Sequence, residues 1–130
     1  MAKIGDQIKT DDFKNEKHVP VISLPPVVNP GEPLQITVSV GKEIAHPNTT
    51  EHFIAWIELY YKPEGGKFLY HLGRADFTAH GATAEGPNTL ACNTEPHAVF
   101  KVKLDRPGQL FATSWCNIHG LWEGSADLKL

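Results

Sequence analysis

Alternation of apolar and polar residues is the strongest pattern in this chain, and it is unbroken across residues 34–40 (LQITVSV). Side chains on a β-strand point to opposite faces in turn, so the pattern predicts a strand with one buried face. The same period recurs at residues 98–104 (AVFKVKL). A third run, residues 53–61 (FIAWIELYY), is rich in aromatic and β-branched residues. These runs predict a protein built mainly from β-strands.

Turn-forming residues separate the predicted strands. Residues 63–66 (PEGG) and 105–108 (DRPG) are typical of the tight turns that join antiparallel strands. About seven strands are predicted in all: residues 19–24, 34–40, 53–61, 67–74, 98–104, 109–115 and 125–130.

The strand pattern also predicts the fold class. No amphipathic helix of useful length separates the strands, so the chain is predicted to be all-β, an immunoglobulin-like antiparallel β-sandwich. Residues 1–130 are expected to form a single domain. One short N-terminal helical turn is expected over residues 11–14, with Thr10 as its cap.

Composition and charge exclude several classes of function. The net charge of -3 provides no basic surface for nucleic acid. No apolar run approaches the roughly 20 residues needed to span a membrane. Residues 1–18 contain no apolar stretch typical of a secretory signal, so a cytoplasmic location is expected. The only cysteines are Cys92 and Cys116, and neither is expected to form a disulfide.

Four of the seven histidines lie where a predicted strand meets a loop: His18, His46, His52 and His119. A β-sandwich gathers its loops at its two ends, so these residues can meet in space. Cys116 precedes His119 by three residues, and both side chains of such a pair can reach one metal ion. A set of imidazoles with one thiolate suits iron, copper or zinc. With only two cysteines, a four-cysteine site is excluded.

Three segments carry a resemblance to a known family: residues 16–22 (EKHVPVI), 40–52 (VGKEIAHPNTTEH) and 116–123 (CNIHGLWE). In order and spacing they resemble superoxide reductase of the small one-iron class, also called neelaredoxin. The resemblance implies an oxidoreductase that converts superoxide, one electron and two protons into hydrogen peroxide. It also implies rubredoxin or a similar small electron-transfer protein as donor, and a homotetramer.

The same resemblance implies the site residues. One mononuclear iron per chain, cycling between Fe2+ and Fe3+, would be held by four histidines and an axial thiolate. Glu16 would occupy the remaining position in the ferric state, and Lys17 would attract superoxide and assist proton delivery. The implied metal ligands are Glu16, His18, His46, His52, Cys116 and His119.

Three other functions are compatible with parts of this pattern. A blue-copper-like electron-transfer protein is also a β-sandwich with a late cysteine and histidine, but it usually adds an axial methionine, and the only one here is Met1. A metal-free immunoglobulin-like binding module and a superoxide dismutase are the other two.

His71, His80 and His97 lie outside the motifs and are expected to have structural or solvent-exposed roles. Trp122 is expected to shield one side of the metal.

Overall fold

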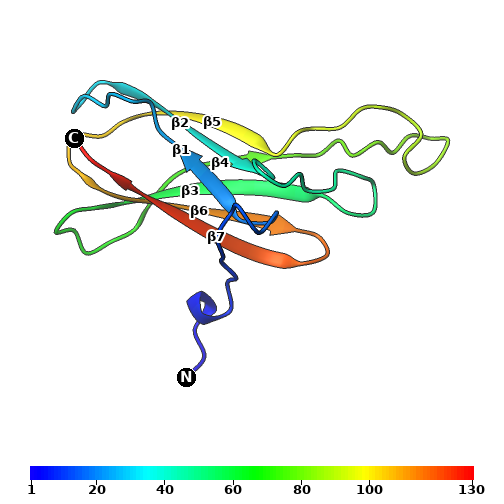
Figure 1. Cartoon of the computed structure of the whole chain (residues 1–130), viewed down its shortest axis with the longest axis horizontal. Helices are drawn as coiled ribbons and strands as arrows, with labels where there is room; N and C mark the ends of the chain where they lie inside the picture. Colours follow the sequence, from blue (N-terminus) through cyan, green and yellow to red (C-terminus); the bar gives the residue numbers. More distant parts are fainter.

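The computed structural model describes residues 1–130, and its seven strands form two antiparallel sheets packed face to face (Figure 1). One sheet has the order β1-β2-β5 and the other the order β4-β3-β6-β7. The strands are β1 (Pro20–Ser23), β2 (Pro33–Val40), β3 (Ile54–Pro63), β4 (Tyr70–Asp76), β5 (His97–Lys103), β6 (Gly108–Cys116) and β7 (Gly120–Leu128). The predicted all-β sandwich is therefore confirmed. No helix in it has the length and apolar character needed to cross a membrane.

The core lies between the sheets and follows the alternation in the sequence. On β2, Leu34, Ile36, Val38 and Val40 are buried, whereas the residues between them are partly or fully exposed. They belong to one cluster of 14 buried residues drawn from both sheets. Fully burying a leucine or isoleucine side chain stabilises a fold by roughly 1.5–3 kcal/mol, so this cluster provides the rigid frame on which the loops are mounted.

Two local predictions differ from the structure. Strand β7 begins at Gly120, five residues before the predicted start, because a tight turn after Cys116 returns the chain directly to pair with β6. Gly120 has a φ of +83°, a conformation that favours glycine. The helical turn is a 3-10 turn at Ile4–Asp6 and not at residues 11–14. Thr10 caps no helix, because its hydroxyl donates to the Glu123 carbonyl at the edge of β7.

Three of the six connections between strands lie at one end of the sandwich, the loop end. Strands β1, β3, β5 and β7 begin there, and β2, β4 and β6 end there (Figure 1). The loops 41–53 and 117–119 lie at this end, together with the long segment 77–96 between β4 and β5, which extends away from the sheets. This end is therefore where residues distant in the sequence meet.

Candidate metal centre

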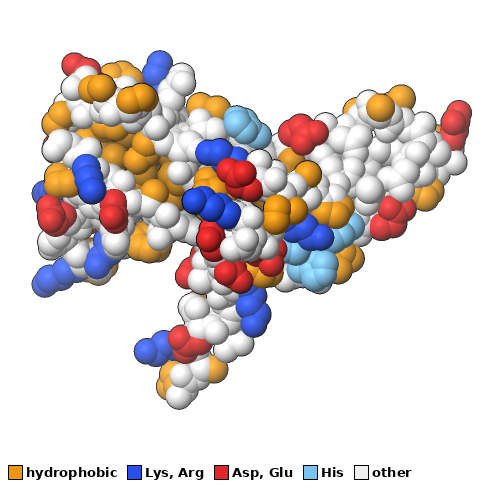
Figure 2. Space-filling model, in the orientation of Figure 1, with side chains coloured by type: hydrophobic (Ala, Val, Ile, Leu, Met, Phe, Trp, Pro, Cys, Tyr) orange, Lys and Arg blue, Asp and Glu red, His pale blue; other side chains and the backbone are white.

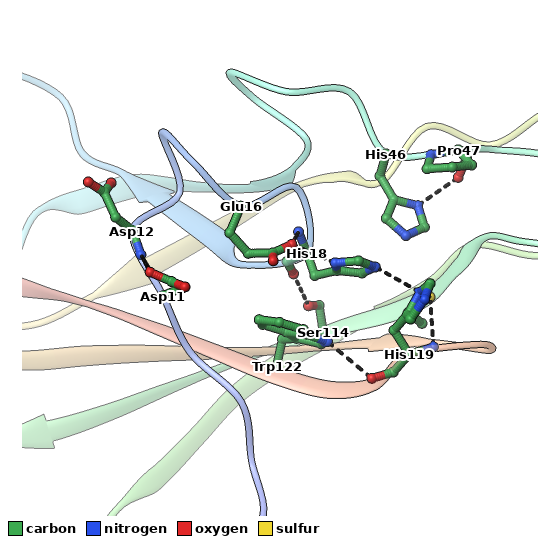
Figure 3. A network of polar contacts seen from close by, with 10 residues as sticks. Asp11, Asp12, Glu16, His18, His46, Pro47, Ser114, His119 and Trp122 are labelled. Atoms are coloured by element: carbon green, nitrogen blue, oxygen red, sulfur yellow. Dashed lines mark hydrogen bonds and ion pairs between the residues drawn. The ribbon is translucent and has the colours of Figure 1, made fainter.

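The loop end of the sandwich brings the predicted histidines and cysteine together. His18, His52, Cys116 and His119 each present a ligand atom, and these atoms all lie within 4.8 Å of one another. His46 lies beside them, with its ring centroid 4.8 Å from that of His18 and 4.7 Å from that of His52 (Figure 3). The five side chains come from three separate segments of the chain: the stretch before β1, the loop 41–53 and the junction of β6 with β7. Their convergence is what a metal centre requires.

Hydrogen bonds orient two of the imidazole rings. The Nδ1–H of His18 donates to Oε1 of Glu16 at 2.6 Å, and the Nδ1–H of His46 donates to the Pro47 carbonyl at 2.6 Å. In a neutral ring this leaves Nε2 with a lone pair, which is the ligand form. In His18 this Nε2 lies 3.1 Å from Nδ1 of His119, so the two rings face each other (Figure 3). The Nε2 atoms of His46 and His52 are buried without a hydrogen-bond partner. Unpaired buried nitrogens are rare in folded proteins, and a metal ion would satisfy both.

The thiol of Cys116 is buried in the turn between β6 and β7. Its Sγ lies 3.8 Å from Nδ1 of His119, and the backbone N–H of His119 donates to it at 3.4 Å. Asn117 connects this turn to the neighbouring loop, because its side chain accepts from the Phe53 N–H at 2.9 Å and donates to the Glu51 carbonyl at 2.8 Å. Asn117 thus fixes Cys116 relative to the loop that carries His46 and His52.

Electrostatics keep the two loop histidines neutral. Burial lowers the pKa of His46 to about 4, and the positive charge of Lys17 acts in the same direction. Burial also lowers the pKa of His52, again with a contribution from Lys17. A neutral imidazole is the form that binds metals. Lys17, which directly precedes His18 in the chain, contributes to the lowered pKa of both rings.

Two residues of the sandwich support His18. Trp122 on β7 stacks on the His18 ring with centroids 4.9 Å apart and planes at 15°, and its Nε1–H donates to the His119 carbonyl at 3.2 Å. Ser114 on β6 donates its hydroxyl to the His18 carbonyl at 3.1 Å (Figure 3). Ser114 was missed by the sequence reasoning. Its position two residues before Cys116 places it on the same buried face of β6, which is the only signal in the sequence.

Glu16 contacts the centre through His18 in this structure. Its Oε1 accepts from both Nδ1 and the backbone N–H of His18, the latter at 2.9 Å. Burial raises the pKa of Glu16, but these hydrogen bonds outweigh it and the pKa is lowered. The carboxylate is therefore ionised at neutral pH, outside the group of converging ligand atoms. Its role as a ligand in the ferric state stays a prediction.

The remaining histidines and the second cysteine lie outside the centre. His71 is on β4, 3.4 Å from Glu58, and His97 is exposed at the start of β5. His80 is buried in the segment 77–96. Cys92 is exposed and free, as expected. Met1 is fully exposed in the N-terminal extension, so it does not provide the thioether of a blue-copper centre.

A β-sandwich that gathers histidines and one buried cysteine at its loop end defines a class of metalloproteins. Comparison with known proteins identifies the family within it. Residues 10–125 match the sequence profile of the family described as desulfoferrodoxin. The superoxide reductase of Pyrococcus furiosus is 52% identical over 97% of this chain and 99% of its own, and the neelaredoxin of Megalodesulfovibrio gigas is 52% identical over 98% of both.

Solved structures agree with this relationship. The superoxide reductase (neelaredoxin) of Archaeoglobus fulgidus in its reduced form aligns with a TM-score of 0.89 and 57% identity, over 95% of this chain and 98% of its own. The chain belongs to the desulfoferrodoxin family. The predicted membership of the superoxide reductases of the neelaredoxin type is confirmed, and with it the predicted enzyme class.

Proposed function

We propose that this protein reduces superoxide to hydrogen peroxide at one mononuclear iron per chain, held by His18, His46, His52, His119 and the thiolate of Cys116. The observation that carries the proposal is the convergence of these side chains, with two buried imidazole nitrogens lacking any other partner. It occurs in a chain whose relatives over nearly their full length are superoxide reductases. Imidazole and thiolate ligands together suit iron.

The donor set explains why an anion can be the substrate. When bound, the iron supplies the single electron that takes superoxide to the peroxide level. Four neutral imidazoles add no charge and one thiolate would cancel only one of the two positive charges of Fe2+, so the centre would keep a net positive charge. The side chain of Lys17 adds to it, and this local field attracts superoxide even though the net charge of the chain is -3.

Hydrogen bonds and packing around the ligands support the same proposal. Glu16 and Pro47 hold the outer nitrogens of His18 and His46, which fixes both rings before a metal arrives. Trp122 covers one face of His18 and limits the access of water there. His119 is exposed, which leaves an open side for a small substrate. We also propose that Glu16 ligates the iron in its ferric state, after its carboxylate releases His18, and that Lys17 orients a proton donor.

The proposal extends to partners and location. A centre with one iron needs an electron after each turnover, and we propose rubredoxin or a similar small carrier, which could approach the exposed Ile118 between two ligands. A homotetramer is proposed because the hairpin of β3 and β4 exposes Phe68, Leu69 and Tyr70. Two free thiols support a reducing, cytoplasmic setting. The kinetics of rubredoxin oxidation by the ferric protein test the proposed electron donor. Sedimentation equilibrium tests the proposed homotetramer.

The reaction is tested by mixing reduced, iron-loaded protein with a pulse of superoxide. Hydrogen peroxide, dioxygen and iron oxidation are measured in the same sample. A reductase forms one peroxide per superoxide consumed, oxidises its iron and releases no dioxygen. A dismutase would release dioxygen without an external donor, and that result would contradict the proposal. A copper–thiolate absorption band in the purified protein would instead favour a blue-copper-like electron-transfer protein.

A further inference from the structure

The segment 77–96 between β4 and β5 is the largest excursion from the sandwich, and the proposed function does not explain it (Figure 1). It contains no lysine or arginine, so it is not suited to attracting superoxide (Figure 2). Its inner part lies against residues 46–52, which include His46 and His52 and form the ligand loop. We propose that this segment positions the ligands His46 and His52 from outside the centre, with His80 and Asn88 as the positioning residues. The inference rests on the proposed iron site.

His80 anchors the segment next to the ligand loop. It is buried, and its ring nitrogens lie 2.8 Å from Oδ1 of Asn48 and 2.8 Å from the Phe77 carbonyl. Its ring also stacks on Phe53, with centroids 3.8 Å apart and planes at 12°. Asn48 is two residues after His46, and Phe53 directly follows His52. His80 therefore holds the ligand loop at both ends without approaching the metal centre itself.

Further hydrogen bonds hold the middle of the ligand loop. The hydroxyl of Thr50 donates to the His80 carbonyl at 2.7 Å, and the backbone N–H of Thr50 donates to Oδ1 of Asn88 at 2.9 Å. Asn88 also donates its side-chain N–H groups to both carboxylate oxygens of Glu51, at 2.8 and 2.9 Å. Asn88 has a φ of 54°, in the left-handed region that asparagine tolerates better than most residues. This backbone conformation directs its amide at the loop.

Residues at the base of the segment 77–96 also contact the ligand loop. The side chain of Asn48 donates to the Thr94 carbonyl at 3.0 Å, and Asn93 donates to the Asn48 carbonyl at 2.8 Å. Within the ligand loop itself, one backbone hydrogen bond is formed, from the Thr49 N–H to the His52 carbonyl at 3.0 Å. The loop is thus held mostly from outside. Removing such outer support from a metal ligand typically lowers metal affinity about 10- to 100-fold.

Two substitutions test this positioning role. His80→Phe keeps an aromatic ring against Phe53 but removes the two ring nitrogens that contact Asn48 and Phe77. Thr50→Val keeps the shape of the side chain but removes the bond to the His80 carbonyl. Thr89→Val is the matched control, because its hydroxyl contacts only Gly86 and Thr83 of the same segment and not the ligand loop.

Three readouts are compared in wild type and variants. Competition with a chromophoric chelator gives the affinity of the metal-free protein for Co2+, and the visible spectrum of bound Co2+ reports ligand geometry. Hydrogen exchange of residues 46–53 in the metal-free protein reports the order of the loop. His80→Phe and Thr50→Val are expected to weaken Co2+ binding about 10- to 100-fold, shift its spectrum and speed exchange across residues 46–53. Thr89→Val is expected to match wild type in all three.

The outcomes separate this inference from the proposed function. If Thr50→Val keeps the Co2+ affinity and the hydrogen exchange of the wild type, the positioning role is overturned. This outcome is decisive even if His80→Phe fails to fold. Equal effects in Thr89→Val and Thr50→Val overturn it as well. Failure of the wild-type protein to bind one metal per chain contradicts the iron site, and exchange of residues 46–53 in Thr50→Val still decides whether the segment orders the loop.

Discussion

Gly124 lets the chain segment that carries His18 lie directly on β7, and replacing it with alanine should disturb the metal centre. A Cβ at this position would be 2.2 Å from the Pro20 carbonyl oxygen and 3.4 Å from the Val19 side chain. Pro20 is the first residue of β1, only two residues after His18. No side chain larger than hydrogen fits there without moving the backbone that positions His18.

The size of the disturbance follows from the geometry. Real Cβ atoms essentially never approach another atom closer than 3.0 Å, so Pro20 must move by about 0.8 Å. Overpacking of this kind costs about 1–3 kcal/mol of unfolding free energy. The same movement strains the bond from the Ser114 hydroxyl to the His18 carbonyl, now 3.1 Å. Displacement of a reacting group by about 1 Å can lower a rate about 100-fold.

The assay combines unfolding and metal binding in Gly124→Ala. Gly5→Ala is the control, because nothing lies within 4 Å of a Cβ at that position. Urea unfolding of the metal-free proteins should show a loss of about 1–3 kcal/mol for Gly124→Ala and none for Gly5→Ala. Chelator competition should show weaker Co2+ binding only in Gly124→Ala. If Gly124→Ala matches wild type in both stability and affinity, this account of how β7 positions His18 is refuted.

Three other substitutions test separate parts of the account. Burial raises the pKa of Glu58, but hydrogen bonds from Tyr60 and Arg74 outweigh it and lower that pKa from its ordinary 4.5. The ionised Glu58 therefore stabilises the fold above about pH 4.5, and this contribution is lost as the pH falls through the lowered value. Glu58→Gln should cost about 1–3 kcal/mol at pH 7 and progressively less below pH 4.5, by urea unfolding; an equal loss at both pH values would contradict this. Lys17→Ala should slow the second-order reaction with superoxide, more strongly at low ionic strength, and a wild-type rate constant at every ionic strength would remove its steering role. Cys116→Ser should abolish the thiolate-to-iron absorption band and most of the activity, so retention of both would exclude Cys116 as a ligand.

The strands could be predicted where one face meets the core and the other meets water. Leu34 to Val40 show this alternation because β2 lies on the core with one face only. The start of β7 could not be predicted in this way, because Gly120 to Glu123 are all partly exposed and show no alternation. The helical turn was misplaced because Thr10 bonds to β7, a contact between segments distant in the sequence.

The residues of the metal centre also differ in whether the sequence alone could predict them. Its histidines and cysteine could be predicted from their positions at strand ends together with the family resemblance. Among the supporting residues, Trp122 is expected from the sequence to lie beside the metal, but Ser114, His80 and Gly124 could not be predicted, because their roles depend on which segments pack together. Ser114 donates to a residue that lies 96 positions earlier in the chain. His80 and Gly124 act by contacts with Asn48 and Pro20, and nothing in local periodicity reports such contacts.

The most direct test of the central claim is a crystal structure of the iron-loaded protein with anomalous diffraction measured at the iron edge. The account predicts one anomalous peak per chain at the loop end of the sandwich, bonded to His18, His46, His52, His119 and Sγ of Cys116. An iron bound elsewhere, or a centre from which any two of these five side chains are absent, would contradict it.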